Sequence, residues 1–326
     1  MTTAITAHYD ESPRTANYEA TTRIANYAGV AQFLFILSTE RSGSTLLSLM
    51  LGGHSSVISP PELHLMAYPT VDEWLQKYPT AMKSLSFLFA SLGLTMDRKQ
   101  IEEKFSGWPP ESLYGWIAAQ PSARAQIIVD KTPKYARYPA VLHRTAKLEP
   151  LYIWLIRHPL GVAASQIALR QDQRKKRSVH FLAGLNQTLL RLRDALRKRE
   201  HVEKEVAYWT WVNTQIEQFL AMIAAERWRQ VHFEELVKEP HVVMDRLCRW
   251  LGVPFEAPML DPQAHIPAAL DPTLGDPKVR HHANIDTEVA ESWRKHYPEQ
   301  LLDSFTGRTL GVPTREAMAR WGIQGP

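Results

Sequence analysis

The sequence predicts an α/β fold, in which a central parallel sheet is flanked by helices. Short apolar runs of strand length occur at residues 32–38, 127–129 and 151–156, and a further candidate lies at residues 231–233. Longer stretches with the apolar spacing of helices separate these runs. Continuously apolar strands that alternate with helices are typical of a parallel sheet covered on both faces.

Most of the chain is expected to form one domain. The 326 residues are 44% hydrophobic and 22% charged, a balance that suits an ordinary globular protein with one large core or two modest ones. Residues 1–30 lack the regular spacing of apolar residues that helices and strands show, and they are interpreted as an N-terminal extension. No internal repeat or shift in composition occurs between residues 33 and 310. We therefore predict a single domain over residues 31–326.

Composition also narrows the function classes. A membrane-spanning helix needs about 18 consecutive apolar residues, and no apolar run is that long, so we expect no membrane span. The N-terminus is polar, so we expect no secretion signal. A net charge of +4 suits an anionic ligand without requiring nucleic acid as a partner. The single cysteine, Cys248, can form no internal disulfide, which favours a reducing, cytoplasmic compartment.

The first strand runs into a loop of small hydroxylated residues. The stretch ILSTERSGSTLL places Arg41, Ser42, Gly43, Ser44 and Thr45 between the strand and the next helix. Ligands of open parallel sheets bind beyond the carboxyl ends of the strands. Successive backbone N–H groups that lead into a helix can surround phosphate oxygens there, and a glycine allows close approach. The loop lacks the Gly-Lys-Ser/Thr ending of P-loop NTPases, so it predicts a different phosphate site.

Two further strands bring a cation to the same edge of the sheet. Lys131 follows the second run in DKTP, and Arg157 follows the third, with Ser165 eight residues later at or within the next helix. Each signal alone has an ordinary explanation: an N-cap turn, a solvated strand end, or a surface salt bridge. Their common placement predicts a polyanion site, to which arginine contributes bidentate phosphate contacts.

This order of motifs resembles the sulfotransferases that use 3'-phosphoadenosine 5'-phosphosulfate (PAPS). The segments HFEELVKEP (232–240) and GDPKVRHHANIDTEVAESWRKHYP (275–298) extend the likeness, which covers residues 33–299. The resemblance implies a P-loop-like sulfotransferase fold, a first loop that holds the 5'-phosphosulfate, and a 3'-phosphate held by Arg157 and Ser165. It also implies a late loop that closes over the nucleotide with Lys278, Arg280 and His281. The product would be adenosine 3',5'-bisphosphate.

Within this family, three segments look closest to the sulfotransferase domains of polyketide synthases, including the curacin and olefin synthase assembly lines. They are HSSVISPPELHLM, LRQD and GDPKVRHHANID. In those systems, sulfation of the β-hydroxyl of an acyl chain on a carrier protein prepares a decarboxylative elimination. The resemblance thus implies an enzyme that sulfates an aliphatic hydroxyl, with an acyl carrier protein as partner. A free lipid, a sugar or another small alcohol is the alternative acceptor.

Sulfuryl transfer to an alcohol needs a base for the hydroxyl proton and cations for the charge on the leaving phosphate. Glu62 is the first candidate for the base, because Pro60 and Pro61 force an extended path back along the first helix, and because the matching Glu of related sulfotransferases is the base. Its alternative role is to begin a helix. His64 and His282 are the other candidates for the base. His64 is expected to face away from Glu62 if the segment is extended, and His282 is expected to bind the acceptor or assist. Arg41 and Lys131 are expected to stabilise the developing charge.

Several remaining features carry weaker expectations. His64, Arg170 and Asp172 are candidates for acceptor contacts, the last two because they match the polyketide domains. The basic run at residues 174–177 suits either an acidic carrier protein or a solvated face. Sulfuryl transfer needs no metal, and the sequence contains no metal-binding motif, so none is expected. Glu40 stands where the family usually has proline, and a carboxylate beside an anion is unfavourable unless it points away.

One alternative belongs to another class, a nucleotide kinase or a nucleotide-binding regulatory module. It shares the opening of strand, loop and helix. It would also need the P-loop lysine and a magnesium-holding acid after a strand, and the sequence shows neither clearly.

Overall fold

A parallel five-stranded sheet forms the centre of the computed structural model, which describes residues 31–120, 127–177, 187–264, 287–296 and 311–324. The strand order is β2-β3-β1-β4-β5, and every neighbouring pair is parallel. The strands are β1 (Gln32–Leu37), β2 (Val57–Ile58), β3 (Ile127–Asp130), β4 (Leu151–Ile156) and β5 (Trp228–His232). The predicted fold class is confirmed. Among the strands in the described ranges, the two-residue edge strand β2 alone was not predicted, because so short a run has no hydrophobic pattern.

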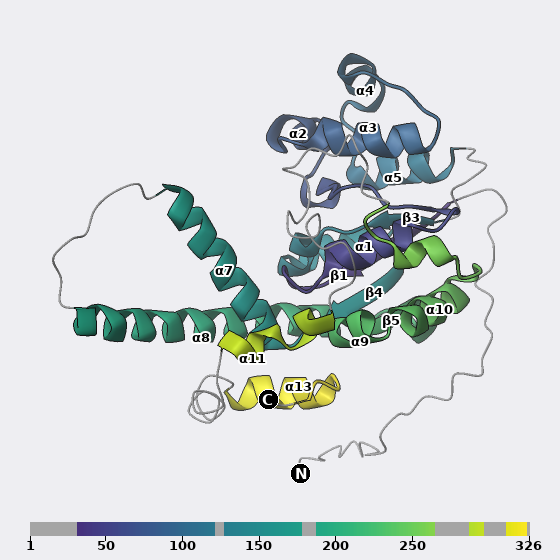
Figure 1. Ribbon diagram of the computed structural model, residues 1–326. Coiled ribbons are helices and arrows are strands. Elements are labelled where there is room, and N and C mark those ends of the chain that lie inside the picture. Colours follow the sequence, from purple (N-terminus) through teal and green to yellow (C-terminus); the bar gives the residue numbers. More distant parts are fainter. Residues whose placement is uncertain (1–30, 121–126, 178–186, 265–286, 297–310, 325–326) are drawn as a thin grey trace, which may run out of the picture.

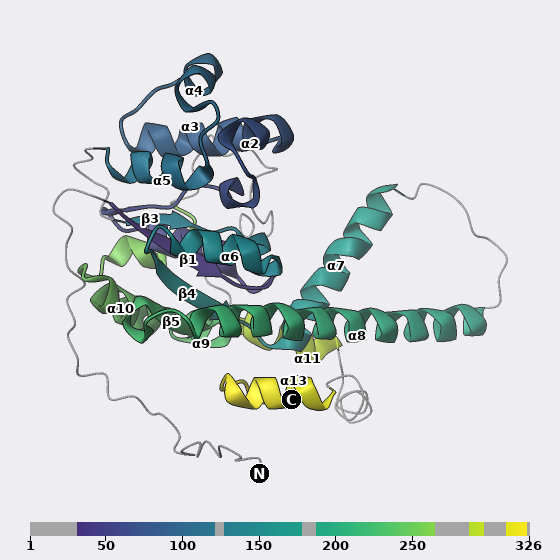
Figure 2. The same ribbon diagram turned by 180° about the vertical axis from the view of Figure 1, so that it is seen from behind.

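Helices cover both faces of the sheet, as Figures 1 and 2 show from opposite sides. One face carries α1 (Ser44–Gly52), α9 (Phe233–Lys238) and α10 (Pro240–Leu251). The other face carries the longer series α2 (Val71–Lys77), α3 (Ala81–Ser91), α4 (Arg98–Phe105), α5 (Pro110–Ala118), α6 (Pro139–Ala146), α7 (Pro159–Arg177) and α8 (Gln187–Leu220). Two short helices near the C-terminus are α11 (Ser292–His296) and α13 (Val312–Arg320). The 3-10 helices of the described residues are η1 (Leu65–Ala67), η2 (Pro133–Arg137), η3 (Ala225–Arg227), η4 (Ala257–Leu260) and η6 (Thr287–Ala290).

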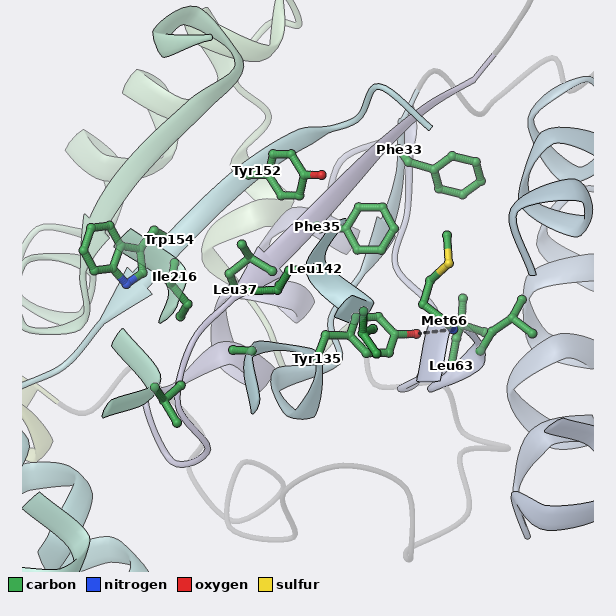
Figure 3. Close-up of a cluster of buried hydrophobic side chains, with 14 of the residues drawn as sticks. Phe33, Phe35, Leu37, Leu63, Met66, Tyr135, Leu142, Tyr152, Trp154 and Ile216 are labelled. Carbon is green, nitrogen blue, oxygen red and sulfur yellow. Dashed lines mark hydrogen bonds between the residues drawn. The ribbon is translucent and has the colours of Figure 1, made fainter. Parts of the chain in front are cut away.

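Successive side chains of β1 point to opposite faces of the sheet, so they belong to two different hydrophobic clusters. Leu34 and Ile36 pack with α1, α9 and α10, whereas Phe33, Phe35 and Leu37 pack into the larger core on the opposite face. Figure 3 shows this larger core, in which the ring of Phe35 lies among tyrosines. Its centroid is 6.3 Å from that of Tyr135 and 6.0 Å from that of Tyr114. Buried tyrosines need partners for their hydroxyls, and both of these hydroxyls point toward the end of β3.

The outer halves of α7 and α8 extend beyond the layers of the sheet (Figures 1 and 2). The inner part of α8 is anchored in the core, where Trp209 is fully buried. Within the described ranges, no helix has both the length and the apolar character that a bilayer span requires. The predicted N-terminal extension, residues 1–30, lies outside the described residues.

Candidate active site

The carboxyl ends of β1, β3 and β4 bring three predicted cations to one edge of the sheet. Because β1 pairs with both β3 and β4, the residues that follow these strands are neighbours. Arg41 Nε donates a 3.0 Å hydrogen bond to Ser165 Oγ, and Arg157 Nη1 donates one of 3.0 Å to the Arg41 carbonyl. Lys131 Nζ lies 3.3 Å from Thr45 Oγ1. The predicted nucleotide-binding residues of these three strand ends therefore form one connected group.

The first loop reaches α1 through two left-handed residues, Arg41 with φ 70° and Gly43 with φ 90°. Gly43 is the N-cap of α1 and offers no side chain to the N–H groups of the first turn, which also contains no acidic residue. The hydroxyls of Thr39 and Ser42 are 2.7 Å apart and close the loop on itself. Such a helix N-terminus, with its positive dipole end and uncapped N–H donors, favours an anion.

Phe233 packs under this loop and orients Arg157. A Cβ atom at Gly43 would lie 2.2 Å from Cδ2 of the Phe233 ring, so only glycine allows this approach. The guanidinium carbon of Arg157 lies 4.3 Å from the centre of the same ring, a cation–π geometry. Trp209 Nε1 donates to the Arg157 carbonyl over 2.9 Å. No local sequence signal links Phe233 to Gly43, because the two lie on distant parts of the chain.

Glu40 is directed toward two partners outside the anion site. One of its carboxylate oxygens is paired with Arg137 of η2, and the other accepts a 2.9 Å hydrogen bond from Tyr208 of α8. Burial, and then the charge of Glu40, raise the pKa of Tyr208, so its hydroxyl remains a donor. These contacts explain how the loop tolerates a carboxylate at this position.

Glu62, His64 and Lys131 form a compact group, here called the Glu62 cluster. Lys131 Nζ donates to Glu62 Oε1 over 2.7 Å, and His64 Nε2 lies 2.8 Å from Glu62 Oε2. Lys131 is 4% exposed, so its charge needs this partner. Burial alone would raise the pKa of Glu62, but the charge of Lys131 and the contact with His64 outweigh burial and hold that pKa well below its ordinary value. Glu62 is therefore an ionised acceptor.

Two expectations for this segment are corrected by the backbone. The expectation that His64 faces away is wrong, because its Nε2 lies 2.8 Å from Glu62 Oε2. Side chains two residues apart point to the same side even in an extended segment, and His64 itself is left-handed with φ 53°. Glu62 precedes η1 and lies in no helix, so its alternative role as a helix start is also wrong. The predicted return along α1 is confirmed by the hydroxyls of Ser48 and Ser59, which are 2.6 Å apart.

Arg170 is the one remaining predicted site residue whose side chain the structure describes. Arg170 forms a 2.6 Å ion pair with Glu205 of α8, and its role in acceptor binding stays a prediction. Asp172 belongs to α7, but its side chain is not among the described ones. Four further predicted residues lie outside the described residues: Lys278, Arg280, His281 and His282. Among the side chains that the structure describes, no group of three His, Cys, Asp or Glu is placed to hold a metal ion.

A cavity of about 290 Å³ lies along α1, on the side of β2 and α3. Ser48, one helical turn beyond Thr45, lines it together with Ser59 and Phe87. One turn before Phe87, Ser84 donates a 3.0 Å hydrogen bond to the Glu62 carbonyl. The helix α1, the segment after β2 and the helix α3 therefore border both the cavity and the Glu62 cluster.

The chain is similar to known proteins in sequence and in fold. A family model described as "Sulfotransferase family" matches residues 34–257, more than half of the chain. Nodulation protein NoeE of Sinorhizobium fredii (strain NBRC 101917 / NGR234) is 26% identical over 289 residues. That alignment covers 83% of this chain but 62% of the relative, so the chain spans less than two thirds of that protein's length.

Two solved structures are similar over nearly their whole length. The "Sulfotransferase Domain from the Curacin Biosynthetic Pathway" is 29% identical with a TM-score of 0.67, and the match covers 91% of this chain and 99% of that domain. The "Sulfotransferase Domain from the Synechococcus PCC 7002 Olefin Synthase" is 26% identical with a TM-score of 0.68, covering 91% and 97%.

The low pKa of Glu62 predicts a pH-dependent contribution to stability. A carboxyl whose pKa is lower in the folded state stabilises that state above its unfolded pKa, and the stabilisation is lost as the pH falls toward the folded value. We expect Glu62→Gln to lower the free energy of unfolding by a constant amount at neutral pH. The difference from the wild type should shrink progressively below about pH 4.5, the ordinary pKa.

Urea denaturation over a series of pH values measures this difference. Glu73→Gln is a matched control, because Glu73 is exposed and pairs with the exposed Lys77 one helical turn away. If the free energies of unfolding of Glu62→Gln and the wild type differ by the same amount at pH 7 and at pH 3, the ion pair with Lys131 is contradicted.

Proposed function

We propose that this chain, which belongs to the sulfotransferase family, transfers the sulfuryl group of PAPS to an aliphatic hydroxyl on an acyl chain. The observation that carries the proposal is the Glu62 cluster beside the N-terminus of α1. It places an ionised carboxylate and a buried lysine next to a set of anion-binding N–H groups.

The donor set fits a nucleotide with phosphate groups at two positions. The uncapped N-terminus of α1, Arg41 and Lys131 would hold the 5'-phosphosulfate, and Arg157 with Ser165 would hold the 3'-phosphate. Charge-assisted hydrogen bonds from arginine and lysine are the contacts expected for such oxygens. When bound, PAPS supplies an activated sulfuryl group on a phosphate leaving group. Lys278, Arg280 and His281 are proposed to close over the nucleotide.

The side chains of the Glu62 cluster have complementary roles in the proposed transfer. Glu62 accepts the proton of the acceptor hydroxyl, while Lys131 and Arg41 stabilise negative charge on the bridging oxygen and the sulfuryl group. A carboxylate paired with lysine is a weak base. When Lys131 shares its N–H donors with a bound anion, its pull on Glu62 weakens and the pKa of Glu62 rises. His64 keeps the carboxylate oriented through its contact with Oε2.

The proposed acceptor is a β-hydroxyacyl chain on an acyl carrier protein. Similarity to sulfotransferase domains from the curacin pathway and from an olefin synthase supports this choice. The cavity along α1 offers room for part of an acceptor. Arg170, Asp172 and His282 are proposed acceptor contacts. A free lipid, sugar or other alcohol is the second candidate. The family match disfavours the alternative of a nucleotide kinase.

An intact-mass assay tests the acceptor directly. The protein is incubated with PAPS and a series of β-hydroxyacyl carrier proteins, with the matching acyl carrier proteins that lack the hydroxyl as controls. We expect a gain of one sulfuryl group on the hydroxylated chains alone, without added magnesium. Transfer to free lipids or sugars, but to no carrier-bound chain, would favour the second candidate.

The proposed 3'-phosphate site predicts selective nucleotide binding. Ser165→Ala should weaken binding of adenosine 3',5'-bisphosphate far more than that of adenosine 5'-phosphate, because only the former carries the group in question. A lost hydrogen bond to a charged group is worth about 1.5 to 3 kcal/mol. Arg157→Ala should act in the same direction, but it also removes the bonds to the Arg41 and Val289 carbonyls.

Isothermal titration calorimetry with both nucleotides measures this selectivity. Gln166→Ala is the matched control, one position along α7 from Ser165. Equal losses for the two nucleotides in Ser165→Ala would refute the assignment of the 3'-phosphate.

Glu62→Gln tests the base, because it keeps the shape of the side chain and removes its capacity to accept a proton. Turnover should fall about 100-fold or more, within the 10²–10⁴ range of general-base contributions. Nucleotide affinity should not fall, because the carboxylate that competes for the Lys131 donors is removed. Single-turnover rates at saturating PAPS measure the chemical step, and Glu73→Gln again serves as the control. If Glu62→Gln keeps a near-normal rate of transfer and His282→Ala is inactive, the general base is His282 and not Glu62.

A further inference from the structure

Asp130, the last residue of β3, is a buried carboxylate that the proposed reaction does not use. It is 1% exposed and is bonded to three hydroxyl groups. Its Oδ1 accepts a 2.7 Å hydrogen bond from Thr132, and its Oδ2 accepts bonds from Tyr114 and, over 3.2 Å, from Tyr135. Burial raises the pKa of Asp130 above its ordinary value, and the hydrogen bonds from these hydroxyls oppose that rise without cancelling it. These three hydroxyls satisfy the buried carboxyl group, as buried polar groups require.

Two of the three hydroxyls also accept hydrogen bonds from the backbone of the segment that carries Glu62. Thr132 Oγ1 accepts a 3.3 Å hydrogen bond from the backbone N–H of His64. The Tyr135 hydroxyl accepts one of 3.1 Å from the backbone N–H of Met66, drawn as the dashed line in Figure 3. Asp130 is therefore linked, through one hydroxyl in each case, to both ends of the turn at residues 64–66.

The carboxyl oxygens of Asp130 determine the direction of these bonds. Because Oδ1 accepts from Thr132 and Oδ2 accepts from Tyr135, each of these hydroxyls directs its single hydrogen at Asp130. Their oxygen lone pairs are then left for the N–H groups of His64 and Met66. An asparagine amide at this position would offer N–H donors as well, and a hydroxyl facing them could no longer donate in that direction.

The turn at residues 64–66 requires these hydrogen bonds because its backbone conformation is unfavourable. His64 is left-handed, a conformation that a residue with a side chain adopts only when its surroundings hold it there. The preceding carbonyls are also held: Trp74 Nε1 donates to Leu63 over 2.7 Å, and Tyr78 donates to Glu62 over 3.2 Å. The position of Glu62 relative to Lys131 therefore depends on hydrogen bonds to the backbone on both sides of it.

We propose that Asp130 is a positioning residue for the sulfuryl transfer, which acts by orienting the hydroxyls of Thr132 and Tyr135 toward the turn at residues 64–66. The inference rests on the proposed function. Asp130 precedes Lys131 directly, so the same strand end places the lysine and, through the two hydroxyls, the carboxylate with which it pairs.

The central test compares Asp130→Asn with the wild type. We expect kcat to fall about 10- to 100-fold, as for a small misplacement of a reacting group, while the affinity for adenosine 3',5'-bisphosphate changes less than about twofold. Because a displaced Glu62 loses part of the influence of Lys131 and His64, its pKa rises toward 4.5. The acid limb of the kcat profile should therefore move to higher pH, which a loss of folded protein alone would not cause.

Three single variants separate the network from general packing. Thr132→Val and Tyr135→Phe each remove one link to the turn and should each shift the profile in the same direction as Asp130→Asn. Tyr114→Phe is the matched control, because it removes a donor to Asp130 but no bond to the turn. It should leave the pH profile unchanged. If Asp130→Asn does not fold, Thr132→Val and Tyr135→Phe decide the question.

Hydrogen exchange of the His64 and Met66 amides gives a readout that needs no acceptor. Both amides should exchange faster in Asp130→Asn and at the wild-type rate in Tyr114→Phe. Unchanged exchange and an unchanged pH profile in Asp130→Asn, or the same changes in Tyr114→Phe, would overturn the proposal. A wild-type protein that transfers no sulfuryl group to any alcohol would instead refute the proposed function, and the exchange rates would still report on the network.

Discussion

The ion pair between Glu62 and Lys131 is the contact on which the geometry of the site depends. Lys131 is almost fully buried at the end of β3, and a buried ammonium without a partner is strongly destabilising. Its partner comes from a segment that returns from α1 through two prolines. The pair therefore joins the sheet, the first helix and the turn at residues 64–66. It also sets the protonation state of Glu62 and the direction of the Lys131 donors.

The three cations of the strand ends would repel one another without compensation. Lys131 is balanced by Glu62, whereas Arg157 donates to the backbone carbonyls of Arg41 and Val289, and Arg41 to a hydroxyl. Glu40 is paired with Arg137 and points away from these three residues. A bound polyanion would add charge-assisted hydrogen bonds with all three cations.

The sequence allowed those parts of the site to be predicted that depend on local order along the chain. An apolar run followed by a cation places that cation at a strand end, so Arg41, Lys131 and Arg157 were found together as expected. Local order does not show which distant residue packs on which. The ring of Phe233 under Gly43 and the pairing of Glu40 with Arg137 arise from the tertiary fold. The left-handed turn at His64 could not be predicted, because it is stabilised by hydrogen bonds that the backbone N–H groups of His64 and Met66 donate to the distant hydroxyls of Thr132 and Tyr135.

The same contacts suggest how binding and chemistry are coupled in the proposed reaction. Lys131 neutralises Glu62 as long as its donors are directed at the carboxylate, so the carboxylate is then a poor base. An anion at the N-terminus of α1 competes for those donors and adds negative charge nearby, and both effects raise the pKa of Glu62. The turn at residues 64–66 keeps the carboxylate in place while its partner changes. The base thus becomes effective only after the nucleotide has bound, which favours binding of the sulfuryl donor before proton removal from the acceptor.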